Sequence, residues 1–195
     1  MYQHYPPLNY AEKDAMDVAE ALQRMGFPRD HIFRPAKTPA TKEEIEEILY
    51  GRLRKAVGPD DRVVVFFAGH GVSRKLPRGV EEGFLLPSNA DPERLERTAI
   101  AMADMERISD RIAAKHILFV IDACRSGFAL KRTPPSEQLL LMADNRVVQI
   151  MAAGLSWETA VEKKGNGIFT AKFLEGLEGA ADKKGVSHLL HTWRF

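Results

Sequence analysis

Two short apolar runs constrain the fold of this chain more than any other feature of its sequence. VVVFFA occupies residues 63–68 and ILFVI occupies residues 117–121. Continuous β-branched and aromatic runs of this length are typical of strands buried on both faces of a parallel sheet. Both are far shorter than the roughly 20 residues that a membrane-spanning helix needs. The runs therefore predict two core strands of an α/β sheet, and no membrane partner.

The rest of the chain alternates between helical and strand-like patterns, which favours an α/β sheet with right-handed crossovers. Apolar residues at helical spacing, a TKEE capping box at Thr41 and a stop at Gly26 predict the helices. Helices are expected within 10–27, 41–56, 102–114 and 167–179, and strands at 31–33, 62–69, 83–87, 116–123 and 146–153. Four glycines or prolines among charged residues predict a loop over 71–83.

Composition narrows the class of protein. A chain of 195 residues with 45% hydrophobic content is expected to form one domain over 1–195. The chain has 28 Lys and Arg residues against 27 Asp and Glu residues, so its net charge is close to zero and does not indicate a polyanion-binding surface. Nucleic acid is therefore not an expected partner. The N-terminal residues lack the layout of a secretion signal, and a single cysteine fits a reducing compartment. We therefore expect a cytoplasmic protein.

Reactive side chains follow both core strands. His70 stands between Gly69 and Gly71, and Cys124, the only cysteine, is followed by Gly127. Ligands bind beyond the carboxyl ends of parallel strands, and neighbouring strands lie roughly 4.8 Å apart. An imidazole at this distance activates a thiol as a nucleophile. The alternatives are a buried, inert cysteine and a hydrogen-bonded structural histidine. A phosphatase is a weaker alternative, because CRSG lacks the cysteine–five residues–arginine cradle.

Five segments carry a resemblance to a known family. FFAGHG together with FVIDACRSG resembles the His and Cys signatures of the caspase-like cysteine endopeptidases, in particular the metacaspase and bacterial caspase-homologue branch. The flanking segments LNYAEKDAMDVAEALQRMGFP, GFLLPSNAD and GIFTAKFLEGLEGAAD are similar to other parts of that family. The resemblance implies a three-layer α/β/α fold around a mostly parallel sheet, with a His loop at 69–83 and a Cys loop at 123–137.

The same resemblance implies the catalytic roles. Cys124 would be the nucleophile and His70 the general base and acid, while the backbone N–H groups of Gly71 and Cys124 would form the oxyanion hole. The reaction would be hydrolysis of peptide bonds in proteins or peptides through an acyl-enzyme. No cofactor is expected, because the thiolate supplies the covalent chemistry and the amides supply the electrostatics.

Two carboxylates suggest the specificity. Asp122 stands two residues before Cys124, so on a strand it faces the same side of the sheet. Asp14 matches the position of a second acidic residue in the primary pocket of metacaspases. Together they would select Arg or Lys before the cut bond. The alternatives are a solvated helix face for Asp14 and a hydrogen-bonded structural role for Asp122.

The sequence departs from the family pattern at both ends. MYQHYPPLN contains no apolar strand ahead of the first helix, and ADKKGVSHLLHTWRF follows the family only faintly. We therefore expect the family's first strand to be missing and both ends to be clipped. A catalytically inactive fragment or pseudo-peptidase that acts as an interaction module is the alternative function, because unpaired strand edges invite association.

Metal and processing sites can also be judged against the family. The calcium-binding acidic positions are largely replaced, by Asn89, Met102, Ala103 and Lys131, and Asp104 alone remains of one acidic run. Too few carboxylates are left for six to eight oxygen ligands, so no metal is expected.

FALKRTPPSEQ should form an exposed loop that the active protein cuts after Lys131 or Arg132. The alternative is an ordinary solvated basic pair.

Overall fold

The computed structural model describes residues 2–77, 79–123, 146–153, 162–163 and 166–179. These residues contain a five-stranded sheet in the order β3-β2-β1-β4-β5 and a two-stranded sheet of β6 and β7. The strands are β1 (Arg62–Lys75), β2 (Glu81–Leu86), β3 (Ile100–Ala101), β4 (His116–Ala123), β5 (Val147–Ala152), β6 (Glu162–Lys163) and β7 (Asn166–Gly167). The helices are α1 (Ala11–Arg24), α2 (Lys42–Glu46), α3 (Leu53–Ala56), α4 (Leu95–Thr98), α5 (Asp104–Ser109) and α6 (Ile168–Leu177).

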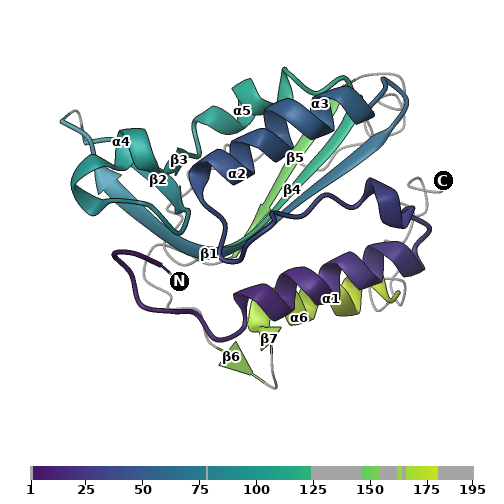
Figure 1. Cartoon of the computed structure of the whole chain (residues 1–195), viewed down its shortest axis with the longest axis horizontal. Helices are drawn as coiled ribbons and strands as arrows, with labels where there is room; N and C mark the ends of the chain where they lie inside the picture. Colours follow the sequence, from purple (N-terminus) through teal and green to yellow (C-terminus); the bar gives the residue numbers. More distant parts are fainter. Residues whose placement is uncertain (1, 78, 124–145, 154–161, 164–165, 180–195) are drawn as a thin grey trace.

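The elements form the three layers that the sequence predicts. Strands β1, β4 and β5 are parallel, while β2 and β3 continue the sheet in antiparallel pairing. Helices α1 and α6 lie together on one face of the sheet, and α2, α3 and α5 lie on the other (Figure 1). This is a mostly parallel sheet between two helical layers. No helix among the described residues is long and apolar enough to span a membrane.

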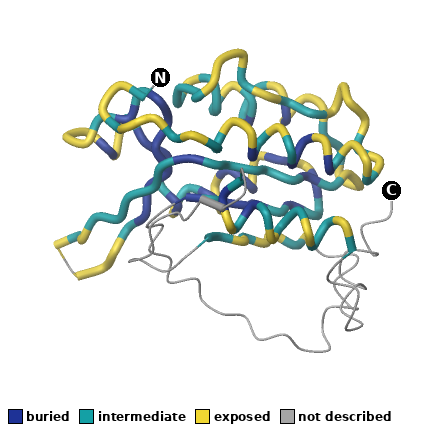
Figure 2. The backbone as a smooth tube through the Cα atoms, turned by 90° about the horizontal axis from the view of Figure 1, so that it is seen from below, coloured by how far each residue is buried: buried dark blue, intermediate teal, exposed yellow. Residues whose placement is uncertain are grey.

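The main core lies between β4 and the layer of α2, α3 and α5. Alternate residues of β4, Ile117 and Phe119, pack in one cluster with Leu53 and Ile108 of the helices. Val120 of β4 is also completely buried. The buried residues therefore follow the middle of the sheet, whereas the exposed ones lie on the outer sides of the helices and at the far end of the β1–β2 hairpin (Figure 2). The predicted core strand at 116–123 is confirmed.

Strand β1 differs from the prediction that it is buried on both faces. Val63 is buried, but residues 64–68 are only half-buried. Over 62–69 the strand pairs with β4 on one side, and among the described residues no strand pairs with the other edge of 63–69. That edge borders a groove of about 1030 Å³, which we call the β1 groove. Residues 2–10 contain no strand, as the sequence predicts.

The β1 groove runs between the two helical layers. It is lined by α1, by the connection over 26–40, by the helical turns over 45–56 and by β1 itself. Most of the side chains that face it are apolar, including Val64 and Phe66 of β1. A strand of this composition needs a neighbour on each edge to be buried, which explains why the predicted burial of β1 is wrong.

The predicted loop over 71–83 is largely a β-hairpin. Residues 70–75 of β1 pair antiparallel with 81–86 of β2. Opposite charges face one another in this pairing, Arg74 with Glu82 and Lys75 with Glu81, and such cross-strand pairs stabilise a ladder. The glycine and proline count therefore overestimated the loop, and His70 lies within a strand rather than after its end. The short strand predicted at 83–87 corresponds to β2.

Other local predictions had mixed outcomes. The capping box at Thr41 is present, and the predicted helix over 41–56 is formed by α2, a π-helical stretch η2 (Glu47–Arg52) and α3. The strand predicted at 31–33 is absent, because the chain makes a 3₁₀ turn η1 (Arg29–His31) and then continues without pairing. The helix predicted at 102–114 is only the short α5. Strand β5 forms, but none of its residues is buried.

Candidate active site

His70 lies where β1 changes partner. The parallel pairing of β1 with β4 ends with Gly69 opposite Ala123, and the antiparallel pairing with β2 begins with His70 opposite Leu86. His70 follows Gly69 in the chain as Cys124 follows Ala123. The register therefore places His70 directly after the residue that pairs with Ala123, which precedes Cys124 in the sequence. Cys124 itself lies outside the described residues.

The N-terminal segment surrounds the His70 imidazole. Nε2 lies 2.8 Å from the carbonyl oxygen of Pro6. The rings of Tyr2 and Tyr5 lie 4.8 and 5.7 Å from the imidazole, centroid to centroid, and the Tyr2 contact is edge-on. The backbone N–H of His70 also donates a hydrogen bond to the Tyr2 hydroxyl, although burial of that hydroxyl raises the pKa of Tyr2 overall. Gln3 anchors the same segment by donating its backbone N–H to the carbonyl of Ser88.

The bond to Pro6 determines which nitrogen of His70 can act as a base. A carbonyl oxygen only accepts hydrogen bonds, so Nε2 must carry the proton. In the neutral imidazole, Nδ1 is then unprotonated and can take a proton from a thiol. The sequence pattern did not identify Pro6, because the contact uses a backbone carbonyl, which every residue has.

Asp122 is held by the first turn of α6. Its Oδ2 accepts hydrogen bonds from the Thr170 hydroxyl at 2.6 Å and from the Thr170 backbone N–H at 3.2 Å. The Thr170 side chain is completely buried. Because the first amides of a helix lack partners within the helix, a carboxylate is stabilised at this end. The hydrogen-bonded state of Asp122 that the sequence left as an alternative is therefore present.

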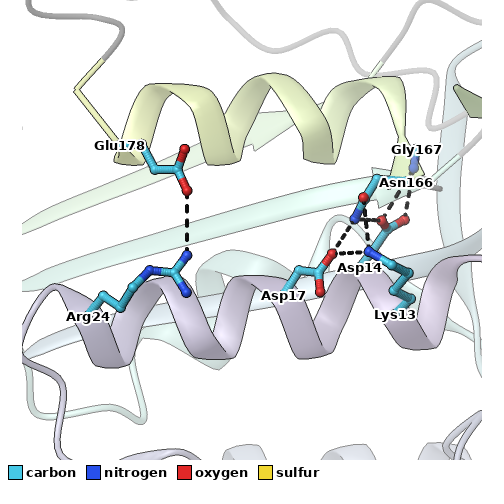
Figure 3. A network of polar contacts seen from close by, with 7 residues as sticks. All are labelled: Lys13, Asp14, Asp17, Arg24, Asn166, Gly167 and Glu178. Atoms are coloured by element: carbon cyan, nitrogen blue, oxygen red, sulfur yellow. Dashed lines mark hydrogen bonds and ion pairs between the residues drawn. The ribbon is translucent and has the colours of Figure 1, made fainter. Parts of the chain in front are cut away.

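Asp14 is buried on α1 and bound to β7, which directly precedes α6 (Figure 3). Its Oδ1 accepts a hydrogen bond from Asn166 Nδ2 at 2.8 Å, and its carboxylate accepts the backbone N–H of Gly167 at 3.2 to 3.3 Å. Burial raises the pKa of Asp14, and the negative charge of Asp122 adds to the rise, whereas the bonds from Asn166 and Gly167 and the charge of Lys13 oppose it. The solvated helix face that was the alternative for Asp14 is excluded.

The two carboxylates meet at Gly167. A Cβ atom at this glycine would lie 2.7 Å from Asp122 Oδ2 and 3.3 Å from Asp14 Oδ2. Within the described ranges no Lys or Arg side chain bonds to either carboxylate, since the nearby Lys13 pairs with Asp17 and Asn166. The structure therefore brings Asp14 and Asp122 together as a pair of like charges.

The remaining predicted site residues have separate positions. Gly71 lies in the paired part of β1, opposite Leu85. Asn89 accepts the backbone N–H of Lys42 and donates to Glu43, so it fastens the start of α2, and Asp104 pairs with Arg107. No group of three or more His, Cys, Asp or Glu residues in the described part of the chain is arranged to hold a metal ion. Lys131 and Arg132 lie outside the described residues.

Comparisons with known proteins concern the fold and the family of this chain. A protein from Geobacter sulfurreducens, GSU0716, has a solved structure similar to this chain, with a TM-score of 0.61 and 17% sequence identity over 89% of this chain and 74% of that one. At this identity the likeness concerns the fold alone. No curated protein matches the sequence. The family model described as the caspase domain matches residues 1–194, and the chain therefore belongs to the caspase-domain family of cysteine peptidases.

Proposed function

We propose that this protein is a cysteine endopeptidase in which Cys124 and His70 form the catalytic pair. The observation that carries the proposal is the bond between His70 Nε2 and the Pro6 carbonyl, 2.8 Å long, at the strand end that adjoins Ala123. This bond fixes the ring and leaves Nδ1 as the base, at the end of the sheet from which Cys124 continues.

The proposed reaction has two stages. His70 Nδ1 takes the thiol proton of Cys124, and the thiolate attacks the carbonyl carbon of the peptide bond. The backbone N–H groups of Gly71 and Cys124 are proposed to stabilise the oxyanion. The imidazolium returns its proton to the leaving amine, which yields the acyl-enzyme. Water, deprotonated by His70, then attacks the thioester and releases the acid and the thiol.

For the substrate, we propose peptides with Arg or Lys before the cut bond. The support is the pair formed by Asp14, which is buried, and Asp122, which is half-buried, since no Lys or Arg side chain of the described residues bonds to either carboxylate. A cationic side chain beside two carboxylates would relieve their repulsion, whereas an acidic one would add to it. A guanidinium, which binds carboxylates with two parallel bonds, would be preferred over an ammonium group.

We further propose that the enzyme acts in the cytoplasm.

The test is hydrolysis of otherwise identical fluorogenic peptides that end in Arg, Lys or Asp. Cys124→Ala and His70→Ala should each abolish cleavage, whereas His31→Ala, an exposed histidine of η1, should not. Residual activity above about a thousandth of the wild-type rate in Cys124→Ala would refute the nucleophile. Faster cleavage after Asp than after Arg would refute the specificity.

One observation favours a second candidate function, an inactive caspase-domain protein that acts as an interaction module. The edge of β1 over 63–69, with which no strand of the described residues pairs, and the apolar β1 groove offer backbone and side-chain partners to a strand of another polypeptide. A wild-type chain that self-associates in light scattering, loses this association in Val64→Lys and cleaves no peptide would favour this candidate. A monomer with Cys124-dependent activity would favour the peptidase.

A further inference from the structure

The segment from Asn166 to Thr170 supplies every hydrogen bond that the described residues make to the two pocket carboxylates. Asn166 Nδ2 and the Gly167 N–H bind Asp14, and the Thr170 N–H and hydroxyl bind Asp122. We call this segment the clasp. It joins β7 to the first turn of α6, so one short stretch of chain holds acidic residues from α1 and from β4.

The clasp acts against electrostatic repulsion. Two carboxylates in a partly dehydrated site repel one another, and the repulsion is relieved by separation, by protonation or by a cation. The four donors of the clasp oppose separation, because moving either carboxylate away would break bonds to a charged acceptor. The arrangement therefore keeps a high negative potential at one place.

Both bonds from Thr170 go to the same oxygen of Asp122. The hydroxyl and the backbone N–H donate to Oδ2, and the described residues make no hydrogen bond to Oδ1. Thr170 thus occupies one oxygen, fixes the plane of the carboxylate and leaves the second oxygen for another donor.

Gly167 contributes by having no side chain. A methyl group there would overlap Asp122 Oδ2, which lies 2.7 Å from the Cβ position, and would crowd Asp14 at 3.3 Å. Since Thr170 is fully buried, Asp122 cannot move toward it to make room. A side chain at 167 would therefore force the carboxylates off their donors.

We propose that Thr170 and Gly167 are positioning residues that set the preference of the pocket for a basic side chain, by holding Asp122 against Asp14. This inference rests on the proposed function, because it concerns the substrate pocket of the same enzyme. It assigns the selectivity to the clasp as well as to the two acidic residues.

The test compares Thr170→Val, which keeps the shape but removes the hydroxyl, with Thr170→Ser, which restores a hydroxyl. Lys172→Ala is the matched control, since Lys172 lies on the same helix and contacts neither carboxylate. The readout is the ratio of kcat/KM for a peptide ending in Arg to that for one ending in citrulline, its neutral analogue. Thr170→Val should lower this ratio roughly tenfold, as expected for the loss of a hydrogen bond to a charged group.

A general loss of stability would lower both rates together and leave the ratio unchanged. Thr170→Ser and Lys172→Ala should keep the wild-type ratio within about twofold. Gly167→Ala should lower the ratio at least as far as Thr170→Val does. If the Gly167→Ala variant does not fold, the result for Thr170→Val alone tests the inference. An unchanged ratio in Thr170→Val would overturn the inference.

A binding measurement separates this inference from the proposed function. Nα-acetyl-arginine amide and Nα-acetyl-citrulline amide are titrated into the full chain and followed by NMR. The arginine compound should bind more tightly to wild type and lose this advantage in Thr170→Val. If this pattern is found but wild type cleaves no peptide, the proposed peptidase is refuted and the inference about Thr170 stands. If wild type binds both compounds equally, the inference that the clasp sets the preference for a basic side chain is refuted, whatever the peptidase activity.

Discussion

The carbonyl oxygen of Pro6 accepts a hydrogen bond of 2.8 Å from Nε2 of His70, a residue 64 positions later in the chain. The contact joins the segment ahead of α1 to the strand that carries the proposed base. Two aromatic rings from the same segment, Tyr2 and Tyr5, also contact the imidazole. A base of fixed orientation and protonation needs such a partner, and here a backbone carbonyl serves.

The first prediction concerns this partner. Pro6→Gly should lower kcat for Arg peptides about tenfold, because a flexible glycine no longer holds the carbonyl against His70. Pro7→Gly is the control, since it makes the same backbone change one residue further along. The measurement is the pH profile of kcat/KM together with the alkylation rate of Cys124. Equal effects of both substitutions would contradict a specific role for the Pro6 carbonyl.

The second prediction concerns the pH dependence of stability at Asp14 and Asp17. Burial is the main cause that raises the pKa of Asp14. The ionised carboxylate is then less favourable in the folded than in the unfolded state. The resulting destabilisation develops as pH rises from the ordinary carboxyl pKa to the raised one. Asp14→Asn should therefore match wild type at acid pH and exceed its free energy of unfolding at neutral pH.

Asp17 is the matched comparison, because it shares Asn166 with Asp14 but has the opposite shift. Burial opposes the change, yet the bonds from Asn166 and Lys13 lower the pKa of Asp17. Its stabilisation is present above the ordinary carboxyl pKa and is lost as pH falls through the lowered one. Asp17→Asn should be less stable than wild type at neutral pH and equal to it in acid. Denaturant unfolding at several pH values measures both, and shifts of the same sign would contradict this account.

The third prediction is calcium independence. The positions that would gather calcium have other tasks here, since Asn89 fastens α2 and Asp104 pairs with Arg107. Peptide hydrolysis should be unchanged by a calcium chelator and by added calcium. A strong loss with chelator that calcium restores would show that residues outside the described ranges complete a metal site.

The fourth prediction is cleavage within the chain after Lys131 or Arg132. If the pocket selects basic side chains, the pair in FALKRTPPSEQ is a substrate on the protein itself. Mass spectrometry of active wild type should find termini at these positions, and Cys124→Ala should remain intact. The double substitution Lys131→Gln and Arg132→Gln should also stay intact while it still cleaves added peptide. Only intact chain in an active preparation would count against self-processing.

The strands and the main helices were predictable because their signals are local. The run ILFVI predicts a buried strand, and TKEE at Thr41 predicts a helix start, from the residues themselves. The pairing of His70 with Cys124 rests on a related signal, since each follows a strand pattern in the sequence, and it stays a prediction. The errors also have local origins. The hairpin of β1 and β2 was missed because its glycines, proline and charged residues favour a loop locally, whereas its opposite charges pair across the two strands.

The sequence by itself determined which residues carry reactive groups and which strands deliver them, because side-chain chemistry and strand periodicity are properties of short segments. Only the tertiary structure decided what those groups contact. The Pro6 carbonyl reaches His70, and Thr170 reaches Asp122 from 48 residues away, because the sheet and the packing of α1 on α6 place their backbones side by side. The half-buried state of β1 was decided in the same way, because the burial of a strand depends on which neighbour lies along each edge.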